Sequence, residues 1–228
     1  MCIRDRFRVP TFTDLYYLRM GNTNLKPEET SQYNVGVTWS SSCGDWLRHF
    51  SISADGYYNT VKDKIVALPT MYVWKMMNMG EVDIKGVDVN LSTQFRLPLR
   101  MSLFLASTYS FQYAVDVTDP EAKNYKDQIP YTPRHSGTVS VTLENPWVNV
   151  SYILTAVGDR YALPQNIDRN RIDSYIEQSI SINRDFRFRY FGLRLQGELL
   201  NLTNVNYDVI QYYPMPGRSW RLSVCLSY

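Results

Sequence analysis

The sequence predicts an all-β fold, an antiparallel transmembrane β-barrel of about nine strands. Apolar and polar residues alternate along most segments, short and long connections alternate between those segments, and aromatic residues make up 14% of the chain. Because successive side chains of a strand point to opposite faces, alternation gives each strand an apolar and a polar face. In an outer-membrane barrel the apolar face contacts lipid.

The last nine residues show the alternation best. Their apolar face comprises Trp220, Leu222, Val224, Leu226 and Tyr228. The same period recurs in eight upstream segments, residues 32–40, 46–60, 86–95, 100–113, 138–144, 148–155, 172–183 and 191–199. Residues 32–40 and 172–183 are the least regular of these segments. Lengths near 10 to 14 residues suit a tilted crossing of a bilayer.

The connections fall into two classes. The short ones are residues 41–45, 96–99, 145–146 and 184–185, and the long ones are residues 61–81, 114–135, 158–171 and 202–217. Short turns on one side and long loops on the other are typical of outer-membrane barrels, with the long loops outside the cell. A soluble β-sandwich shows the same alternation, but we would not expect it to sort its connections by length.

Composition excludes several functional classes. A net charge of +2 does not indicate a nucleic-acid partner. Three Cys and two His fit neither a disulfide framework nor a metal site, and we expect no cofactor. Without a Ser-His-Asp set or a phosphate-binding loop, the sequence does not predict an enzyme.

The chain is expected to be part of a longer protein. The amino-terminal residues lack the apolar region of a signal peptide, which an exported protein should have. No run of about 18 apolar residues exists, so the sequence predicts no transmembrane helix. An odd number of strands would also leave open edges in lipid. From the missing signal peptide we also expect that the sequence begins within a gene and that residues 1–6 are not native sequence.

Several ordered blocks resemble the TonB-dependent outer-membrane receptor family. The blocks are FRVPTFTDLYY (residues 7–17), GNTNLKPEETSQYNVGV (21–37), NMGEVDIKGVDVNLS (78–92), LLNLTNVNYDV (199–209) and PMPGRSWRLSVCLSY (214–228). The resemblance covers nearly the whole chain. It implies that residues 1–228 are the carboxy-terminal part of a 22-stranded barrel whose amino-terminal plug and TonB box are absent from this sequence.

The resemblance also implies a function and a set of partners. The family takes up scarce nutrients such as iron siderophores, cobalamin or haem across the outer membrane of Gram-negative bacteria. Its partners are outer-membrane lipid, the TonB complex, which acts through the plug, and the barrel assembly machinery. The alternating residues that end at Tyr228 resemble the signal that this machinery reads. A passive pore or a structural adhesion barrel is the alternative, and the ligand cannot be read from the sequence.

The resemblance implies that extracellular loops catch the substrate and that the barrel wall performs no bond chemistry, so the candidate ligand contacts lie in the long connections. They are Tyr72, Trp74, Met76, Tyr161, Tyr212 and Tyr213. Aromatic and thioether side chains can hold an apolar or chelate ligand, although they can equally pack on neighbouring loops. We expect Arg8, Asp14 and Arg19 to form structural ion pairs. We expect Asp88, Asn90, Arg194 and Glu198 to face the lumen.

Overall fold

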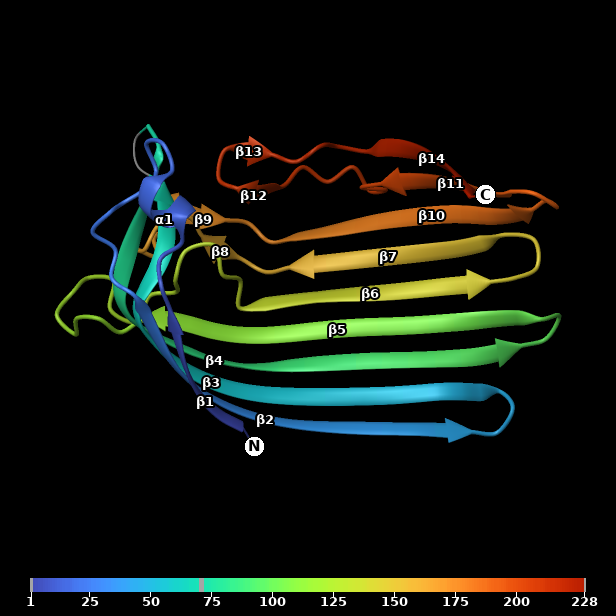
Figure 1. Cartoon of the computed structure of the whole chain (residues 1–228), viewed down its shortest axis with the longest axis horizontal. Coiled ribbons are helices and arrows are strands. Elements are labelled where there is room, and N and C mark those ends of the chain that lie inside the picture. Colours follow the sequence, from blue (N-terminus) through green and yellow to red (C-terminus); the bar gives the residue numbers. More distant parts are fainter. Residues whose placement is uncertain (1, 70–71, 228) are drawn as a thin grey trace.

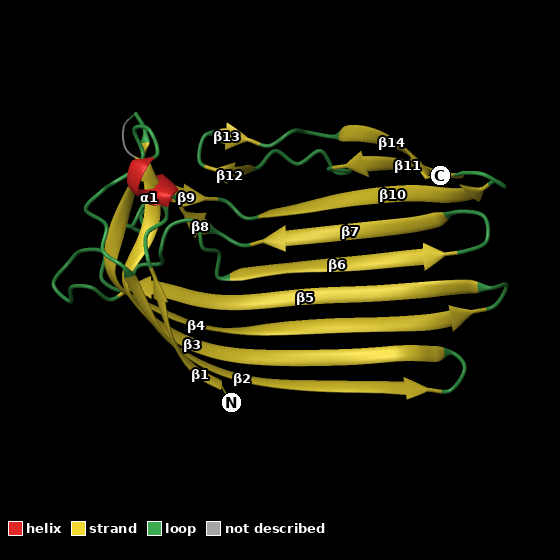
Figure 2. Cartoon of the chain, in the orientation of Figure 1, coloured by secondary structure: helices red, strands yellow, loops and turns green. Residues whose placement is uncertain are grey.

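The computed structural model describes residues 2–69 and 72–227, and its main element is one ten-stranded antiparallel sheet (Figures 1 and 2). In spatial order its strands are β1 (Cys2–Arg8), β2 (Glu28–Cys43), β3 (Leu47–Pro69), β4 (Trp74–Leu97), β5 (Met101–Asp116), β6 (His135–Glu144), β7 (Asn149–Val157), β10 (Tyr175–Arg187), β11 (Gly192–Leu200) and β14 (Ser219–Ser227). The long connections carry two small hairpins, β8 (Arg160–Tyr161) with β9 (Arg171–Ile172) and β12 (Asp208–Ile210) with β13 (Tyr213–Pro214), and the short helices α1 (Phe12–Tyr16) and η1 (Asp168–Asn170).

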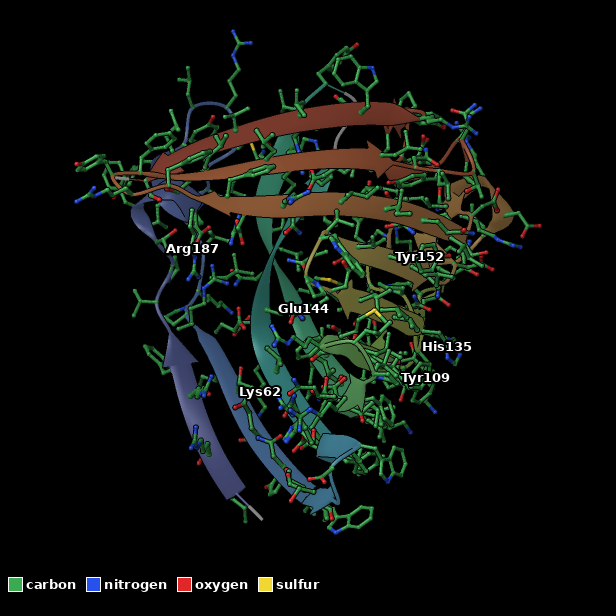
Figure 3. All side chains as sticks on the ribbon, turned by 90° about the vertical axis from the view of Figure 1, so that its right-hand side faces the viewer. Lys62, Tyr109, His135, Glu144, Tyr152 and Arg187 are labelled. Atoms are coloured by element: carbon green, nitrogen blue, oxygen red, sulfur yellow. The ribbon has the colours of Figure 1, made fainter. Side chains whose placement is uncertain are left out.

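The sheet curves into a trough with a convex and a concave face. Figure 3 looks from the short-turn end and shows Tyr109 and Tyr152 on the convex side, with Glu144 and Arg187 toward the concave side. Large apolar residues of the predicted outward face of the last strand are exposed, among them Leu222, Val224 and Leu226, and so are Val37 and Trp39 of β2. The predicted alternation is confirmed as the organising feature of the wall.

One predicted count differs from the structure. The described residues form ten main strands rather than nine, because Cys2–Arg8 pairs with β2 from Cys2↔Asn34 to Arg8↔Glu28. Three Arg and an Asp interrupt the apolar pattern of this segment, so alternation did not reveal it. Ladder hydrogen bonds depend on the backbone, and the charged side chains do not prevent them.

Two predicted connections are also corrected. Much of the connection at residues 61–81 is strand, because the β3–β4 ladder continues from Val61↔Val82 to Pro69↔Trp74. The predicted turn at residues 184–185 belongs to strand β10, and the chain reverses at Phe188–Phe191, where Phe188 N–H donates to the Phe191 carbonyl at 2.9 Å.

The remaining connections sort as expected. Figure 1 shows the short turns at one end of the sheet, with the carboxy terminus, and the long connections at the other. Gly44 turns the β2–β3 connection with φ of +66°, a conformation that costs glycine little. In the β6–β7 turn the Asn145 side chain accepts hydrogen bonds from the N–H groups of Trp147 and Val148, both at 2.9 Å. No helix within the described ranges is long and apolar enough to span a membrane.

A compact apolar cluster anchors the long-connection end of the sheet. Its buried members are Val61, Met79, Val82, Ile84, Ala114 and Ile129. Ile129 belongs to the connection after β5, and its N–H donates to the Ala114 carbonyl at 3.0 Å. The connection after β5 is therefore held against the carboxy-terminal end of β5, and it contributes to the site described next.

Candidate functional site

A cavity of about 1020 Å3 opens among the long connections. Four segments distant in sequence line it: the start of β4, the connection after β5, the β8–β9 connection and the β12–β13 hairpin. The lining residues are Tyr72, Val73, Trp74, Tyr131, Leu163, Gln165, Ile167, Arg169, Asn170, Ile210, Gln211, Tyr212 and Tyr213. Its size matches that of pockets that hold cofactor-sized ligands.

The β12–β13 hairpin is held by a buried cation. Arg160 is only 3% exposed, and its Nη2 donates to the carbonyls of Asp208 and Val209. Its guanidinium lies 5.5 Å from the centre of the Tyr175 ring, which stacks on Tyr207 at 4.0 Å. These contacts position the hairpin that carries Tyr212 and Tyr213 into the lining.

Tyr131 joins two walls of the cavity. Its ring centre lies 5.8 Å from that of Trp74, and its N–H donates to the Tyr161 carbonyl at 2.7 Å. Burial raises the pKa of the Tyr131 phenol, against the opposing effects of the Gln211 backbone and of Arg160. The phenol is therefore neutral at physiological pH and can donate or accept a hydrogen bond.

The β8–β9 connection is ordered by bonds to its own backbone and to the hairpin. Asn170 Nδ2 donates to the Gln165 carbonyl at 2.9 Å, and Gln211 Nε2 donates to the Arg169 carbonyl at 3.1 Å. Arg169 is the one charged residue among the described lining residues. The cavity thus combines aromatic surface, amide groups and one cation, a set that can bind a ligand through ring faces, hydrogen bonds and charge.

Four of the six predicted contacts meet in this cavity: Tyr72, Trp74, Tyr212 and Tyr213. Met76 lies outside the lining, and its backbone bonds to the segment after α1, with its N–H donating to the Met20 carbonyl at 2.9 Å. Tyr161 also lies outside the lining, and its carbonyl accepts the hydrogen bond from the Tyr131 N–H. The structure thus places these two residues away from the cavity, and ligand contact by the other four stays a prediction.

Sequence reasoning missed several lining residues, chiefly Tyr131, Gln165, Arg169 and Gln211. Tyr131 is an aromatic residue in a long connection, and the search for loop aromatics could have included it. The polar residues carried no such signal, because only the packing of separate connections brings them to one cavity.

The amino-terminal prediction of ion pairing holds for two of its three residues. Arg8 bonds Asp14 at 3.0 Å and Glu28 at 3.4 Å, which ties α1 to the start of β2. Asp14 also accepts a hydrogen bond from the Thr11 N–H at 2.9 Å. This bond lowers the pKa of the Asp14 carboxyl, against the effect of burial and with a further contribution from Arg8.

Comparison with known proteins decides the family. The family model described as "TonB dependent receptor-like, beta-barrel" matches residues 5–202. This chain belongs to that family. For a TonB-dependent receptor barrel, an outer-membrane location follows from the family.

Two curated relatives of this TonB-dependent receptor barrel are vitamin B12 transporters BtuB. The protein of Vibrio vulnificus is 25% identical over 225 residues, and that of Photobacterium profundum is 25% identical over 224 residues. The matches cover 96% and 94% of this chain but 33% and 32% of the relatives. The chain therefore spans about a third of the length of these relatives.

Solved structures support the same fold. The copper transporter OprC superposes with a TM-score of 0.70 at 17% identity, covering 96% of this chain and 36% of OprC. The unliganded ferric citrate transporter FecA gives 0.67 at 13% identity, with 90% and 32% covered. At these identities the likeness concerns the fold alone.

The concave face of the receptor barrel carries the predicted polar residues in bonded pairs. Arg194 bonds Asp185, and Glu198 bonds Arg221, across adjacent strands. Asp88 accepts a hydrogen bond from Ser110 at 2.5 Å. Asn90 Nδ2 donates to Ser53 at 3.3 Å. These residues satisfy one another within the wall.

The terminal strand β14 presents its predicted apolar residues outward. Trp220, Leu222, Val224 and Leu226 are 79%, 68%, 60% and 66% exposed, and Tyr228 lies outside the described residues. Their placement fits an assembly signal, and recognition by the assembly machinery stays a prediction.

Proposed function

We propose that this chain belongs to a receptor for TonB-dependent active uptake of a scarce small-molecule nutrient. In this proposal the chain supplies part of the barrel wall and an extracellular ligand cavity. The aromatic cavity that joins Tyr72, Trp74, Tyr212 and Tyr213 is the observation that carries the proposal, because four connections converge to build it. A wall that only formed a pore would not need such convergence.

The chemistry of the cavity fits an amphipathic ligand of substantial size. Ring faces contact apolar or chelated surface, and Arg169 with the amides can bind peripheral oxygen atoms. Relatives and structural neighbours carry vitamin B12, copper and ferric citrate in their names. Cobalamin, iron siderophores and haem are the ligand classes that we propose, and the TonB complex would drive uptake through the plug of the complete receptor.

Ligand binding by the full-length receptor tests the proposal. Equilibrium titrations with cyanocobalamin, ferric citrate and haemin identify the probe that binds. The double variant Trp74→Ala/Tyr213→Ala should weaken binding of that probe at least tenfold, because two ring contacts are lost, each with about 1 kcal/mol or more. Tyr190→Ala is the matched control, because Tyr190 is 80% exposed at the opposite end of the sheet.

Two results would contradict the proposal. Unchanged binding in the double variant would show that the cavity is not the ligand site. Steady ion conductance of the full-length protein in a planar bilayer, with no binding of any probe, would instead indicate a passive pore.

A further inference from the structure

The concave faces of β5, β6 and β7 are rich in hydroxyl groups. On β6, every second residue from Ser136 to Thr142 carries a hydroxyl group, and these residues share a face with Glu144, which Figure 3 shows toward the concave side. Their hydroxyl-bearing partners are Thr108 and Ser110 on β5 and Ser151 and Thr155 on β7. We call the concave faces of these three strands the hydroxyl sector.

Charged side chains lie on the concave face to either side of the hydroxyl sector. Asp55 and Asp88 are direct cross-strand partners on β3 and β4, and β11 carries the ion-paired Arg194. On β5 to β7, whose residues are all described, charged side chains share the concave face only near the strand ends, at Asp116 and Glu144. Because neutral hydroxyl groups form weaker hydrogen bonds than charged groups do, the hydroxyl sector holds a passing molecule less strongly.

The long-connection end of the trough is covered unevenly. Over β4 and β5, Ile129 of the connection after β5 belongs to one buried cluster with Ile84 and Ala114. In contrast, Tyr131 and residues 163–170, which line the ligand cavity, belong to the connections that lead into β6 and β10. Figure 1 shows β8 and β9 beyond the ends of β7 and β10. The ligand cavity therefore lies at the long-connection end of the hydroxyl sector.

A second cavity extends from the hydroxyl sector onto β10. Its volume is about 430 Å3, and its lining joins Ile153, Ser179 and Ser181 to Met215 of the connection after β11. We call it the lumenal groove. Ile153 pairs with Ser179 on one side and with Ser140 on the other, so the groove directly adjoins the hydroxyl sector.

The charged residues of the lumenal groove are held within the wall. Among the described lining residues they are Glu177, Glu198 and Arg221. Arg221 pairs with Glu198, and Glu177 accepts hydrogen bonds from the Ser179 hydroxyl at 2.8 Å and from the Asn201 N–H at 3.3 Å. A ligand in the groove would mainly contact hydroxyl groups and apolar side chains, a combination that suits an amphipathic molecule.

We propose that the nutrient leaves the ligand cavity along the concave faces of β6, β7 and β10, with the lumenal groove as an intermediate binding site. A path needs sites that bind well enough to accept a molecule and weakly enough to release it. The hydroxyl groups from Ser136 to Thr142 provide such contacts over roughly 20 Å, at about 3.3 Å per residue. This inference rests on the proposed function, and it places the Asp55–Asp88 pair outside the path.

One row of cross-strand pairs supplies matched variants for a test in the full-length receptor. The row runs from β3 to β10 through Ser51, Ser92, Ala106, Ser140, Ile153 and Ser179. Ser140→Trp and Ser179→Trp place an indole ring on the proposed path. Ser51→Trp places the same ring on the concave face of β3, outside the path.

Uptake into cells and binding to the purified receptor are measured separately with labelled cyanocobalamin, ferric citrate and haemin. For the probe that the parent takes up, Ser140→Trp and Ser179→Trp should lower the uptake rate roughly tenfold or more, because the added ring narrows the path. The dissociation constant of that probe should change by less than about twofold, since the ligand cavity is untouched. Ser51→Trp should keep the uptake rate of the parent.

Three results would overturn the path and leave the proposed function standing: equal uptake in the parent and all variants, an equal loss in Ser51→Trp, or weakened binding that accounts for the lost uptake. A parent receptor that binds and takes up none of the probes would instead contradict the proposed function, and the path would fall with it. If Ser140→Trp does not assemble, Ser179→Trp against Ser51→Trp makes the same comparison.

Discussion

The convex wall and the long-connection end of this receptor barrel follow different physical rules. Along β4, Val87, Val89 and Leu91 face outward because alternate side chains of a paired strand must do so. Around the cavity, side chains such as Arg160 and Asn170 hold the connections by bonding to backbone carbonyls. In the wall, whether a side chain faces outward or inward follows from its odd or even position along the strand. At the long-connection end, a residue's environment follows from partners far away in sequence.

The largest expected effect tests whether alternate residues of a wall strand face outward. Val89→Arg should destabilise the folded full-length receptor by about 2–4 kcal/mol, because it places a charge near the middle of the apolar band. Asn90→Arg, one residue away on the lumen side, should cost much less. Urea unfolding in lipid vesicles measures both. Equal losses in the two variants would contradict the assignment of the faces.

This contrast also explains how much the sequence could predict. The wall was predictable, because lipid on one face forces a period of two on segments such as residues 86–95. The end of the β3–β4 hairpin escaped prediction, because residues 61–81 lack regular alternation and backbone pairing alone continues the ladder. Strand β1 escaped for a related reason, since its Arg residues obscured the pattern.

The candidate site was predictable only in part. Tyr72, Trp74, Tyr212 and Tyr213 drew attention as aromatic residues in long connections, and they do meet. Arg169 and Gln211 could not be chosen, because nothing local distinguishes them from other polar loop residues. Their place in the lining depends on how the β12–β13 hairpin docks, and that depends on the distant Arg160.

The next effect concerns that docking. Arg160→Ala should lower the local free energy of opening of residues 208–214 by about 1.5–3 kcal/mol, because charge-assisted hydrogen bonds to two carbonyls are lost. Hydrogen exchange of this hairpin should then be roughly ten- to a hundredfold faster, while exchange in β4 stays unchanged. Arg160→Lys should restore part of the protection. Unchanged exchange in the alanine variant would show that other contacts hold the hairpin.

Two glycines of the wall, Gly86 and Gly197, differ in the space around them. A Cβ on Gly86 would lie 2.4 Å from the Phe111 carbonyl oxygen and 2.5 Å from the Tyr57 hydroxyl, whereas one on Gly197 would meet nothing within 4 Å. Gly86→Ala should therefore cost about 1–3 kcal/mol, as overpacking does, and Gly197→Ala should be nearly neutral. Thermal unfolding of the two variants side by side measures the difference, and a larger loss at Gly197 would refute this explanation.

The smallest expected effect concerns the short helix α1, which lies in the connection between β1 and β2. Thr11 caps α1, and Thr11→Ala should destabilise the helix by about 1 kcal/mol. The folded pKa of the neighbouring Asp14 lies below its ordinary value, so its contribution is complete at neutral pH. It is lost only as the pH falls below about 4, through the folded pKa.

Hydrogen exchange of residues 12–17, corrected for the intrinsic rate, checks both statements. Protection should be constant between about pH 5 and 8 and fall in stronger acid. A decrease in protection already at neutral pH would contradict the assigned direction of the Asp14 shift.

The central claim is that alternate residues of the wall contact hydrocarbon, and spin labels test it most directly. Single nitroxide labels are placed at each position from 86 to 92 of the full-length receptor in vesicles. Labels at Val87, Val89 and Leu91 should be relaxed by oxygen, which partitions into lipid. Labels at Asp88 and Asn90 should respond to a water-soluble nickel chelate. A nickel response without alternation along this strand would contradict the account.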